Sequence, residues 1–277
     1  MIIAGILAFF ANKSFPETDF DGLLVTFVDV GQGDCTFIKT PGGKTVLIDC
    51  GEGDAFKMQL RPFLKSHNTR RIDYLIGTHY HSDHIGGAEE VFEEFEVQNL
   101  VIPGHSPQNS RKKALIKAAN DEGTKIYQLY AGDNFPKIDE GINISVLHPQ
   151  AGKVSDDEND NSLVLKLEYS GTTILFTGDL EENGEKEVLS KYDIEADILK
   201  VGHHGSSTSS SKEFLEAVDA TYAVVQCGRD NRYGHPHYEV LDNLSDNDVL
   251  VYRTDEDKSV SFYLTEKGIE KIETDSF

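Results

Sequence analysis

The residues best suited to chemistry lie in one short stretch, Thr78–Gly87, which reads T-H-Y-H-S-D-H-I-G-G. Three histidines and one aspartate fall within six positions of it: His79, His81, Asp83 and His84. Imidazole is the commonest metal-ligating side chain and is largely unprotonated at neutral pH. Nitrogen and oxygen ligands together favour Zn²⁺, Mn²⁺ or iron over Mg²⁺ or Ca²⁺. The stretch therefore predicts a metal site.

The elements on either side must hold this stretch in a tight loop. Ile72–Ile76 predicts a short strand before it, and Gly86–Phe95 predicts the start of a helix after it. On an extended segment, His79 and His81 project to the same side, where they can hold one cation. The aspartate and the third histidine lie on the turn beyond and point elsewhere, which suits a second cation close to the first.

Composition is typical of a folded chain with one sizeable core. The 277 residues are 38% hydrophobic, and the net charge is −22. That charge repels polyanions at long range and counts against a protein that coats nucleic acid. It leaves a local phosphate site open, because metal ions can dominate the field at close quarters. Cys35, Cys50 and Cys227 are odd in number and far apart, so no disulfide framework is expected.

The first 21 residues are predicted to form a separate apolar segment and linker. Met1–Ala11 is apolar, too short to span a bilayer, and has neither a positive start nor a clear cleavage site. A clipped signal or anchor and a first strand or apolar tail are both open. The compartment is therefore open as well, with an extracytoplasmic place, secreted or membrane-anchored, slightly favoured. Residues 22–277 are predicted to form one catalytic domain.

Short β-rich runs come in two batches, and helical segments follow each batch. The first batch starts with Leu23–Val30 and ends near Lys125–Tyr130; the second starts with Ile142–Leu147. Two such batches predict two sheets packed face to face with helices outside, a four-layer αββα sandwich. Helices are expected at Phe56–Lys65, Ser110–Glu122, Glu181–Leu189, Ser210–Val218 and Tyr238–Leu244, with Ser110 and Ser210 as N-caps.

Two aspartates at predicted strand ends can support the metal site. The carboxylate of Asp49 can accept a hydrogen bond from a ligand histidine and fix its tautomer; a turn-forming aspartate is the equally weighted alternative. Asp179 follows a buried strand and Gly178, and its two oxygens can bridge two cations. Capping the next helix is the alternative for Asp179, and the two roles are compatible.

A pair of histidines follows another predicted strand. His203 and His204 lie in K-V-G-H-H-G-S, before a hydroxyl-rich turn that includes Ser206. Backbone N–H groups and hydroxyls at a helix start suit a phosphate oxygen. A histidine beside them can donate a proton to a leaving oxygen. Ser206 is expected to bind substrate rather than to attack it, because the chain has no G-x-S-x-G motif.

The last histidines, His235 and His237, lie in a loop that also carries Arg229 and Arg232. A histidine between a strand-ending glycine and a helix is a candidate metal ligand. The two arginines can clamp phosphate oxygens. Two surface histidines in a loop are the alternative, and that alternative is preferred unless the other motifs are present.

Five blocks occur in order along the chain: D-V-G-Q-G-D, H-x-H-x-D-H-x-G-G, N-D-N-S-L-V-L, L-K-V-G-H-H-G-S and R-x-N-R-Y-G-H-P-H. The second block resembles the signature of the metallo-β-lactamase superfamily. Together the blocks resemble the metallo-β-lactamase-like domain of the ComEC family of DNA-uptake proteins, from about Leu23 to the C-terminus. The membrane channel of that family has no counterpart in these blocks, so the resemblance implies a free-standing relative of that one domain.

The resemblance implies an αββα fold with two divalent cations, Zn²⁺ or Mn²⁺, at one edge, and hydrolysis of phosphodiesters. It also implies an outer-shell role for Asp49, which then supports a ligand histidine. The implied metal ligands are His79, His81, Asp83, His84, Asp179 and one of the last two histidines, for which we choose His235, with His237 as outer support.

One block departs from the wider superfamily. Most hydrolases of the superfamily add a histidine before the strand predicted at Leu163–Tyr169, whereas this chain has Asp160-Asn161-Ser162 there. Asn161 can ligate through its amide oxygen or through a water molecule, and His148 is the alternative. The first cation is then held more loosely, which leaves the choice between Zn²⁺ and Mn²⁺ open.

These features predict a metal-dependent phosphodiesterase or nuclease. A metal-bridging hydroxide is expected to attack phosphorus, and His203 or His204 to assist the leaving group, with Asp83 also in the catalytic set. The expected substrate is a phosphodiester, with single-stranded DNA as a candidate. A membrane channel of the uptake type is a candidate partner, and nothing in the sequence indicates an oligomeric state.

Two other functions are open. The first is hydrolysis of a lactone, thioester or phosphorylcholine-type ester, because strong acidity repels DNA. The basic residues available for a strand are Arg70, Arg71, Arg111–Lys113 and Lys200. The second is a catalytically silent, metal-stabilised module for DNA uptake, which the missing histidine favours.

Overall fold

The computed structural model describes residues 20–105 and 109–275, and the apolar segment Met1–Ala11 lies outside them. The strands form two mixed sheets. One sheet has the order β14-β13-β1-β2-β3-β4-β5-β6, and the other β12-β11-β10-β9-β8-β7. The first comprises β1 Leu23–Phe27, β2 Thr36–Lys39, β3 Thr45–Ile48, β4 Arg71–Ile76, β5 Glu96–Pro103, β6 Lys125–Leu129, β13 Ser259–Thr265 and β14 Gly268–Asp275. The second comprises β7 Ile142–His148, β8 Val164–Tyr169, β9 Thr172–Phe176, β10 Ile198–Lys200, β11 Tyr222–Val225 and β12 Leu250–Arg253.

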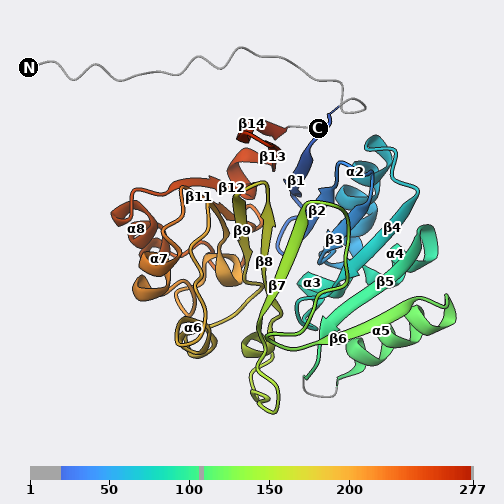
Figure 1. Cartoon of the computed structure of the whole chain (residues 1–277). Coiled ribbons are helices and arrows are strands. Elements are labelled where there is room, and N and C mark those ends of the chain that lie inside the picture. The colour runs from blue at the N-terminus through green and yellow to red at the C-terminus, as the bar shows by residue number, and fades with distance from the viewer. Residues whose placement is uncertain (1–19, 106–108, 276–277) are drawn as a thin grey trace, which may run out of the picture.

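Helices cover the outer faces of both sheets (Figure 1). On the first sheet they are α1 Gly53–Ala55, a π-helical turn at Phe56–Leu60, α2 Arg61–Ser66, α3 Ser82–Ile85, α4 Ala88–Glu94 and α5 Ser110–Asp121. On the second they are α6 Glu182–Leu189, α7 Lys212–Val218 and α8 Tyr238–Asp246, while the short α9 Thr254–Asp257 leads from β12 into β13. The predicted αββα sandwich is thus confirmed. No helix in the described ranges combines the length and apolar character needed to cross a bilayer.

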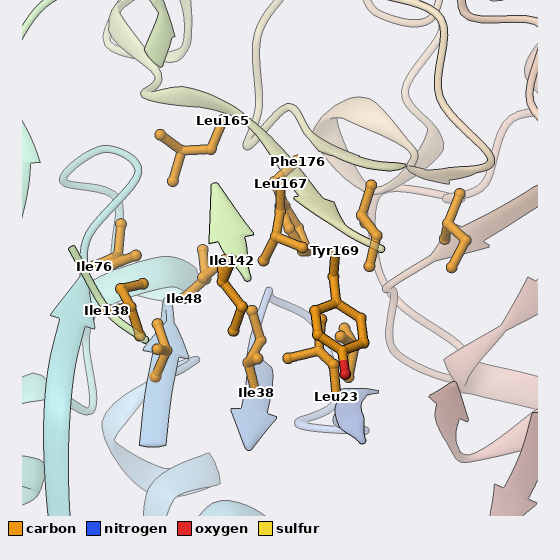
Figure 2. Packing of buried hydrophobic residues seen from close by; sticks show 14 of the residues in the cluster. Leu23, Ile38, Ile48, Ile76, Ile138, Ile142, Leu165, Leu167, Tyr169 and Phe176 are labelled. Carbon is orange, nitrogen blue, oxygen red and sulfur yellow. The ribbon is translucent and has the colours of Figure 1, made fainter. Parts of the chain in front are cut away.

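The core lies in three layers because each sheet is covered on both faces. Along β3, Val46 and Ile48 point into the layer between the sheets, whereas Leu47 packs under the helices. Figure 2 shows the layer between the sheets, where Ile38 of the first sheet lies opposite Leu167 of the second. Strands buried on both faces read as continuous apolar runs, which explains the weak alternation in the sequence.

Parallel strands place the functional loops at one edge of the molecule. In the first sheet β3, β4, β5 and β6 run parallel, and in the second β9, β10, β11 and β12 do so. In sheets of this kind, ligands bind beyond the carboxyl ends of parallel strands. Every histidine-bearing block of the sequence analysis except His148 lies in a loop that follows such a strand.

Several local boundaries differ from the predictions. The helix predicted at Gly86–Phe95 is α4, which begins after Gly87, and a further short helix, α3, lies inside the metal loop before it. A Cβ on Gly87 would lie 2.8 Å from the carbonyl oxygen of Cys50, so this glycine permits the close approach of two backbones. The N-cap of α5 is Asn109, not Ser110, because the side chain of Asn109 accepts the hydrogen bond from the N–H of Lys112.

Two further caps are also placed differently. The N-cap of α7 is Ser211, whose hydroxyl accepts from the N–H of Phe214, whereas the predicted Ser210 lies in the left-handed region with φ of 55°. Glu181 is the N-cap residue of α6 and makes no side-chain cap, and the N–H of Gly184 in the first turn donates to Asp160 Oδ1 at 3.3 Å. Asp179 therefore does not act as its N-cap, which leaves its carboxylate free for the site.

Candidate metal centre

Asp179 is the residue on which two groups of ligands converge. It follows β9, and its side chain is buried. On one side the ligand atoms of His79, His81 and Asp179 all lie within 4.8 Å of one another. On the other side His84, His204 and Asp179 meet the same criterion together with Asp34. A shared carboxylate between two histidine pairs is the arrangement expected for two cations close together.

The first group lies where β4 gives way to the metal loop. His79 Nε2 lies 3.1 Å from His81 Nδ1 and 3.8 Å from Asp179 Oδ2. His79 is fully buried, whereas His81 is partly exposed to the cavity described below. This group therefore offers two imidazole nitrogens and one carboxylate.

The second group is more deeply buried and has an additional carboxylate. His84 Nε2 lies 3.1 Å from Asp179 Oδ2, and His204 Nε2 lies 3.5 Å from the same oxygen. Asp83 Oδ2 accepts a hydrogen bond from His204 Nε2 at 3.3 Å. Asp83 and both histidine Nε2 atoms thus face one point beside Asp179.

Outer groups fix the orientation of both histidines in the second group. His84 Nδ1 donates to Asp49 Oδ2 at 2.8 Å, and His204 Nδ1 donates to the carbonyl oxygen of Gln226 at 2.9 Å. A carboxylate and a carbonyl can only accept, so each Nδ1 carries a hydrogen and each Nε2 is turned toward Asp179. Asp49 also accepts from the N–H and hydroxyl of Thr78, at 2.8 and 2.6 Å.

The sequence analysis overlooked the role of Asp34 and misassigned Lys200. Asp34 contacts the Nδ1 atoms, 3.2 Å from His204 and 3.7 Å from His84, so it backs the histidines from outside. The ammonium of Lys200 is buried against Asp34, donates to the carbonyl oxygen of Gly178 at 2.9 Å and lies 3.9 Å from Asp179. Lys200 is therefore unable to contact a nucleic-acid strand. A charged residue inside the apolar run I-L-K-V was the available signal.

Charge and burial together set the protonation of this cluster. Burial alone would lower the pKa of His204, but the negative charges of Asp179 and Asp34 raise it to about 10. Burial and the positive charge of His84 hold the pKa of His79 well below its usual value. Burial would raise the pKa of Asp179, yet His84 and His204 hold it well below the usual range. The carboxylate of Asp179 is therefore ionised and ready to ligate.

The remaining predicted residues lie around a cavity of about 300 Å³ that opens beside Asp179. His203 lines it, with Nδ1 3.2 Å from Glu181 Oε1 and Nε2 3.9 Å from Asp179 Oδ2. His235 also lines it but lies further out, its ring 6.1 Å from that of His204 and stacked on Tyr233. Burial and the charge of His204 lower the pKa of His235 to about 4.

Other predicted residues are not brought into the cavity. His237 accepts from the N–H of Ser207 at 2.9 Å, and the hydroxyl of Ser206 lies 3.0 Å from that of Thr208. Arg232 is exposed and donates to the hydroxyl of Tyr233 at 2.6 Å. Arg229 lines a neighbouring cavity. The arginine that lines the metal cavity is Arg111 at the start of α5.

The two residues suggested for the missing histidine also face elsewhere. The amide of Asn161 is used within its own loop: Oδ1 accepts from the N–H of Ser155, and Nδ2 donates to the carbonyl oxygens of Ser155 and Asp157. His148 donates from Nδ1 to the carbonyl oxygen of Ser162 at 2.9 Å and lines a different cavity.

The donor set fits the two divalent cations expected from the sequence. His84 Nε2 and Asp179 Oδ1 are buried, and neither takes part in a hydrogen bond with a described residue. Buried polar atoms without partners are rare in folded proteins unless a ligand or ion satisfies them. Imidazole nitrogen and carboxylate oxygen suit Zn²⁺ and Mn²⁺. The two clusters are therefore a candidate metal site.

Comparison with known proteins assigns the family. The family model described as the metallo-beta-lactamase superfamily matches residues 28–229, which is most of the chain. This range includes the metal loop and the histidines His203 and His204. This chain belongs to the metallo-beta-lactamase superfamily. Members of this superfamily are typically metal-dependent hydrolases.

Two competence proteins are among the relatives of this superfamily member. ComE operon protein 3 of Bacillus subtilis is 35% identical over 255 residues, which cover 86% of this chain and 32% of the relative. Competence protein ComA of Neisseria gonorrhoeae is 30% identical over 271 residues, covering 97% of this chain and 36% of the relative. The predicted resemblance to the ComEC type is thus confirmed, although the chain spans about a third of the length of these relatives.

A solved structure supports the fold independently of sequence. The metallo-beta-lactamase fold protein YhfI from Bacillus subtilis aligns with a TM-score of 0.52 and 15% identity, covering 83% of this chain and 96% of that one. At this identity the likeness concerns the fold alone.

Proposed function

We propose that this protein is a metal-dependent phosphodiesterase that cleaves nucleic-acid phosphodiesters, with single-stranded DNA as the first substrate to test. The observation that carries this proposal is the buried carboxylate of Asp179 between two histidine pairs, His79 with His81 and His84 with His204. The competence proteins among its relatives support a nucleic-acid substrate. An association with an uptake channel stays a prediction.

The residues of the chain divide the work of hydrolysis. His79, His81 and Asp179 would hold one cation, and Asp83, His84, His204 and Asp179 would hold the other. When bound, two such cations activate a water molecule and neutralise charge on a phosphoryl group. Asp49 and the carbonyl of Gln226 keep the ligand histidines in the required tautomer.

Residues of the cavity wall bind the substrate and supply the proton for the leaving group. Nδ1 of His203 donates to the hydroxyl of Thr208 at 3.2 Å, and that hydroxyl donates to Glu181 Oε1 at 2.9 Å. Nε2 of His203 therefore faces the cavity, 3.9 Å from Asp179 Oδ2. In its protonated form His203 donates a proton to the leaving oxygen. Arg111, at the cavity wall, binds a non-bridging phosphate oxygen. His204 acts as a metal ligand in this proposal, rather than as a proton donor.

A hydrolase of small esters on the same scaffold is the second candidate. Among the described residues that line this cavity, Arg111 is the one arginine or lysine, and the chain as a whole carries a net charge of −22. A long polyanion gains little from such a surface. A lactone, a thioester or a phosphorylcholine-type ester needs fewer positive contacts.

A side-by-side assay separates the two candidates. The purified full chain is stripped with a chelator, reloaded with Zn²⁺ or Mn²⁺, and tested on single-stranded DNA, a small nitrophenyl phosphodiester and a lactone. We expect turnover of both phosphodiesters, lost on chelation and restored by metal. Full activity of the stripped protein, or turnover of the lactone alone, would refute the phosphodiesterase proposal.

A further inference from the structure

Two asparagines of the N-D-N-S loop have opposite surroundings. Both polar atoms of the Asn161 amide are used within the loop, as described above. Asn159 is also buried, with 7% of its surface exposed, but its side chain makes one hydrogen bond among the described residues, from Nδ2 to Glu181 Oε1 at 3.3 Å. Its Oδ1 is buried and makes no hydrogen bond with any described residue.

The chemistry of Glu181 fixes which way the amide of Asn159 points. A carboxylate oxygen can only accept, so the nitrogen of the amide must face Glu181. The amide oxygen must then point away from Glu181. Glu181 does not line the metal cavity, whereas Asn159 lines it together with His81 and Asp179. The unpartnered oxygen is thus the polar atom that Asn159 has left for the cavity.

The loop that carries Asn159 is held firmly in place. The N–H of Asn159 donates to Asp157 Oδ1 at 3.0 Å, and its carbonyl oxygen accepts from the N–H of Ser162 at 2.9 Å. The hydroxyl of Ser162 in turn accepts from the N–H of Asp179 at 3.1 Å. The loop is therefore tied directly to the shared carboxylate, so Asn159 has a fixed position relative to Asp179.

The two ligand groups differ in number, and the loop of Asn159 packs beside the smaller group, because the N–H of Tyr80, between His79 and His81, donates to Glu158 Oε1 at 3.3 Å. His79, His81 and Asp179 offer three protein ligands, whereas the second group has Asp83, His84, His204 and Asp179. We propose that the amide oxygen of Asn159 is a further protein ligand of the cation held by His79 and His81, and that it shifts this position toward Mn²⁺ rather than Zn²⁺. Carbonyl oxygen suits Mn²⁺, whereas imidazole suits Zn²⁺. This inference rests on the proposed two-cation centre.

Metal titration of the full chain tests the inference without an activity assay. Calorimetry and equilibrium dialysis with Mn²⁺ and Zn²⁺ give the number of bound cations and the affinity of each. In Asn159→Ala, one equivalent should keep its affinity for Mn²⁺, and the other should weaken by at least about tenfold, the scale on which even outer-shell losses act. Asp156→Ala removes an exposed carboxylate from the same loop and should change neither equivalent.

Asn159→His supplies a second, opposite readout. A histidine in this position replaces the carbonyl oxygen with imidazole. The ratio of Zn²⁺ to Mn²⁺ affinity at the position beside His79 and His81 should therefore rise at least about tenfold. This variant decides the matter if the alanine variant does not fold. Unchanged affinities in Asn159→Ala, or an unchanged preference in Asn159→His, would overturn the inference.

The wild-type titration keeps this inference separate from the proposed function. If the wild-type chain binds no cation and hydrolyses none of the three substrates, the metal-dependent phosphodiesterase fails, and the role of Asn159 fails with it. If the wild-type chain binds two cations and the Asn159 variants bind them equally well, the role of Asn159 alone fails.

Discussion

The candidate metal centre has two halves, and their surroundings differ. The His79 half contains His79 and His81, the His84 half contains His84 and His204, and Asp179 lies between them. In the His84 half, both histidines are 1% exposed or less, and each Nδ1 is bonded to a carboxylate or a carbonyl. In the His79 half, His81 is partly exposed, and the partner of His79 Nδ1 among the described residues is the hydroxyl of Thr78, at 3.2 Å. Ligands held by outer hydrogen bonds are pre-oriented. The His84 half should therefore bind its cation first and more tightly.

Charge reinforces this difference. Asp34, Asp49 and Asp83 all contact histidines of the His84 half, and Lys200 offsets part of this negative charge from the buried side. In the His79 half, Asp179 is the one carboxylate among the described residues that cluster as ligands. The comparison teaches that a single motif supplies ligand-type side chains to two clusters, while the surrounding residues decide how firmly each cluster is oriented.

The largest effect is expected from removing the residue that both halves share. Asp179→Ala takes one ligand from each cation, so both equivalents should weaken and hydrolysis should fall at least about a hundredfold, since bound metal contributes several kcal/mol to the transition state. Metal content and the hydrolysis rate are measured on the same preparation. Glu195→Ala, an exposed carboxylate change, is the control. A variant that loses only one equivalent would show that the halves do not share Asp179.

The next effect concerns the stability of the His84 half. Lys200→Met leaves the buried carboxylate of Asp34 without its ammonium partner, which should lower the free energy of unfolding of the metal-free protein by about 3–5 kcal/mol. Urea denaturation measures it, and the loss should shrink when a cation is bound nearby. Lys186→Met, which removes an exposed i,i+4 pair with Glu182, should have no measurable effect. Equal stability of Lys200→Met and wild type would contradict the pairing.

The smallest effect is expected from loosening one ligand without removing it. Asp49→Ala deletes the acceptor of His84 Nδ1, so affinity at the His84 half should fall about 10–100-fold while the other half keeps its affinity. Competition with a chromogenic chelator measures both affinities. An equal loss in both halves would mean that Asp49 acts through the whole loop rather than through His84.

Much of this arrangement is predictable from sequence, because ligand-type residues at strand ends are rare by chance. The motif at Thr78–Gly87 and the strand-end position of Asp179 predict the site, and the two batches of short apolar runs predict the αββα fold. The sequence does not separate His204 from His235, since both follow a strand and a glycine. Only the packing of the sheets places His204 in the buried cluster and His235 at the cavity wall.

Residues that resemble ordinary structural features are the ones that sequence reasoning overlooked. Asp34 ends a glycine-rich turn, and Lys200 lies at the end of a strand that is otherwise apolar. The choice between Asn159 and Asn161 depends on which of two residues in one short 3₁₀ turn faces the cavity. That orientation follows from hydrogen bonds to Ser155 and Glu181. Both partners lie outside the N-D-N-S block, so the block alone does not reveal it.

The central claim is that two cations share the carboxylate of Asp179. Anomalous scattering from crystals of the full chain loaded with Mn²⁺ measures this directly. The account predicts two peaks roughly 3.5–4 Å apart, one beside His79 and His81 and the other beside His84 and His204, with Asp179 between them. Peaks that lie away from Asp179, or no peak at these histidines, would contradict it.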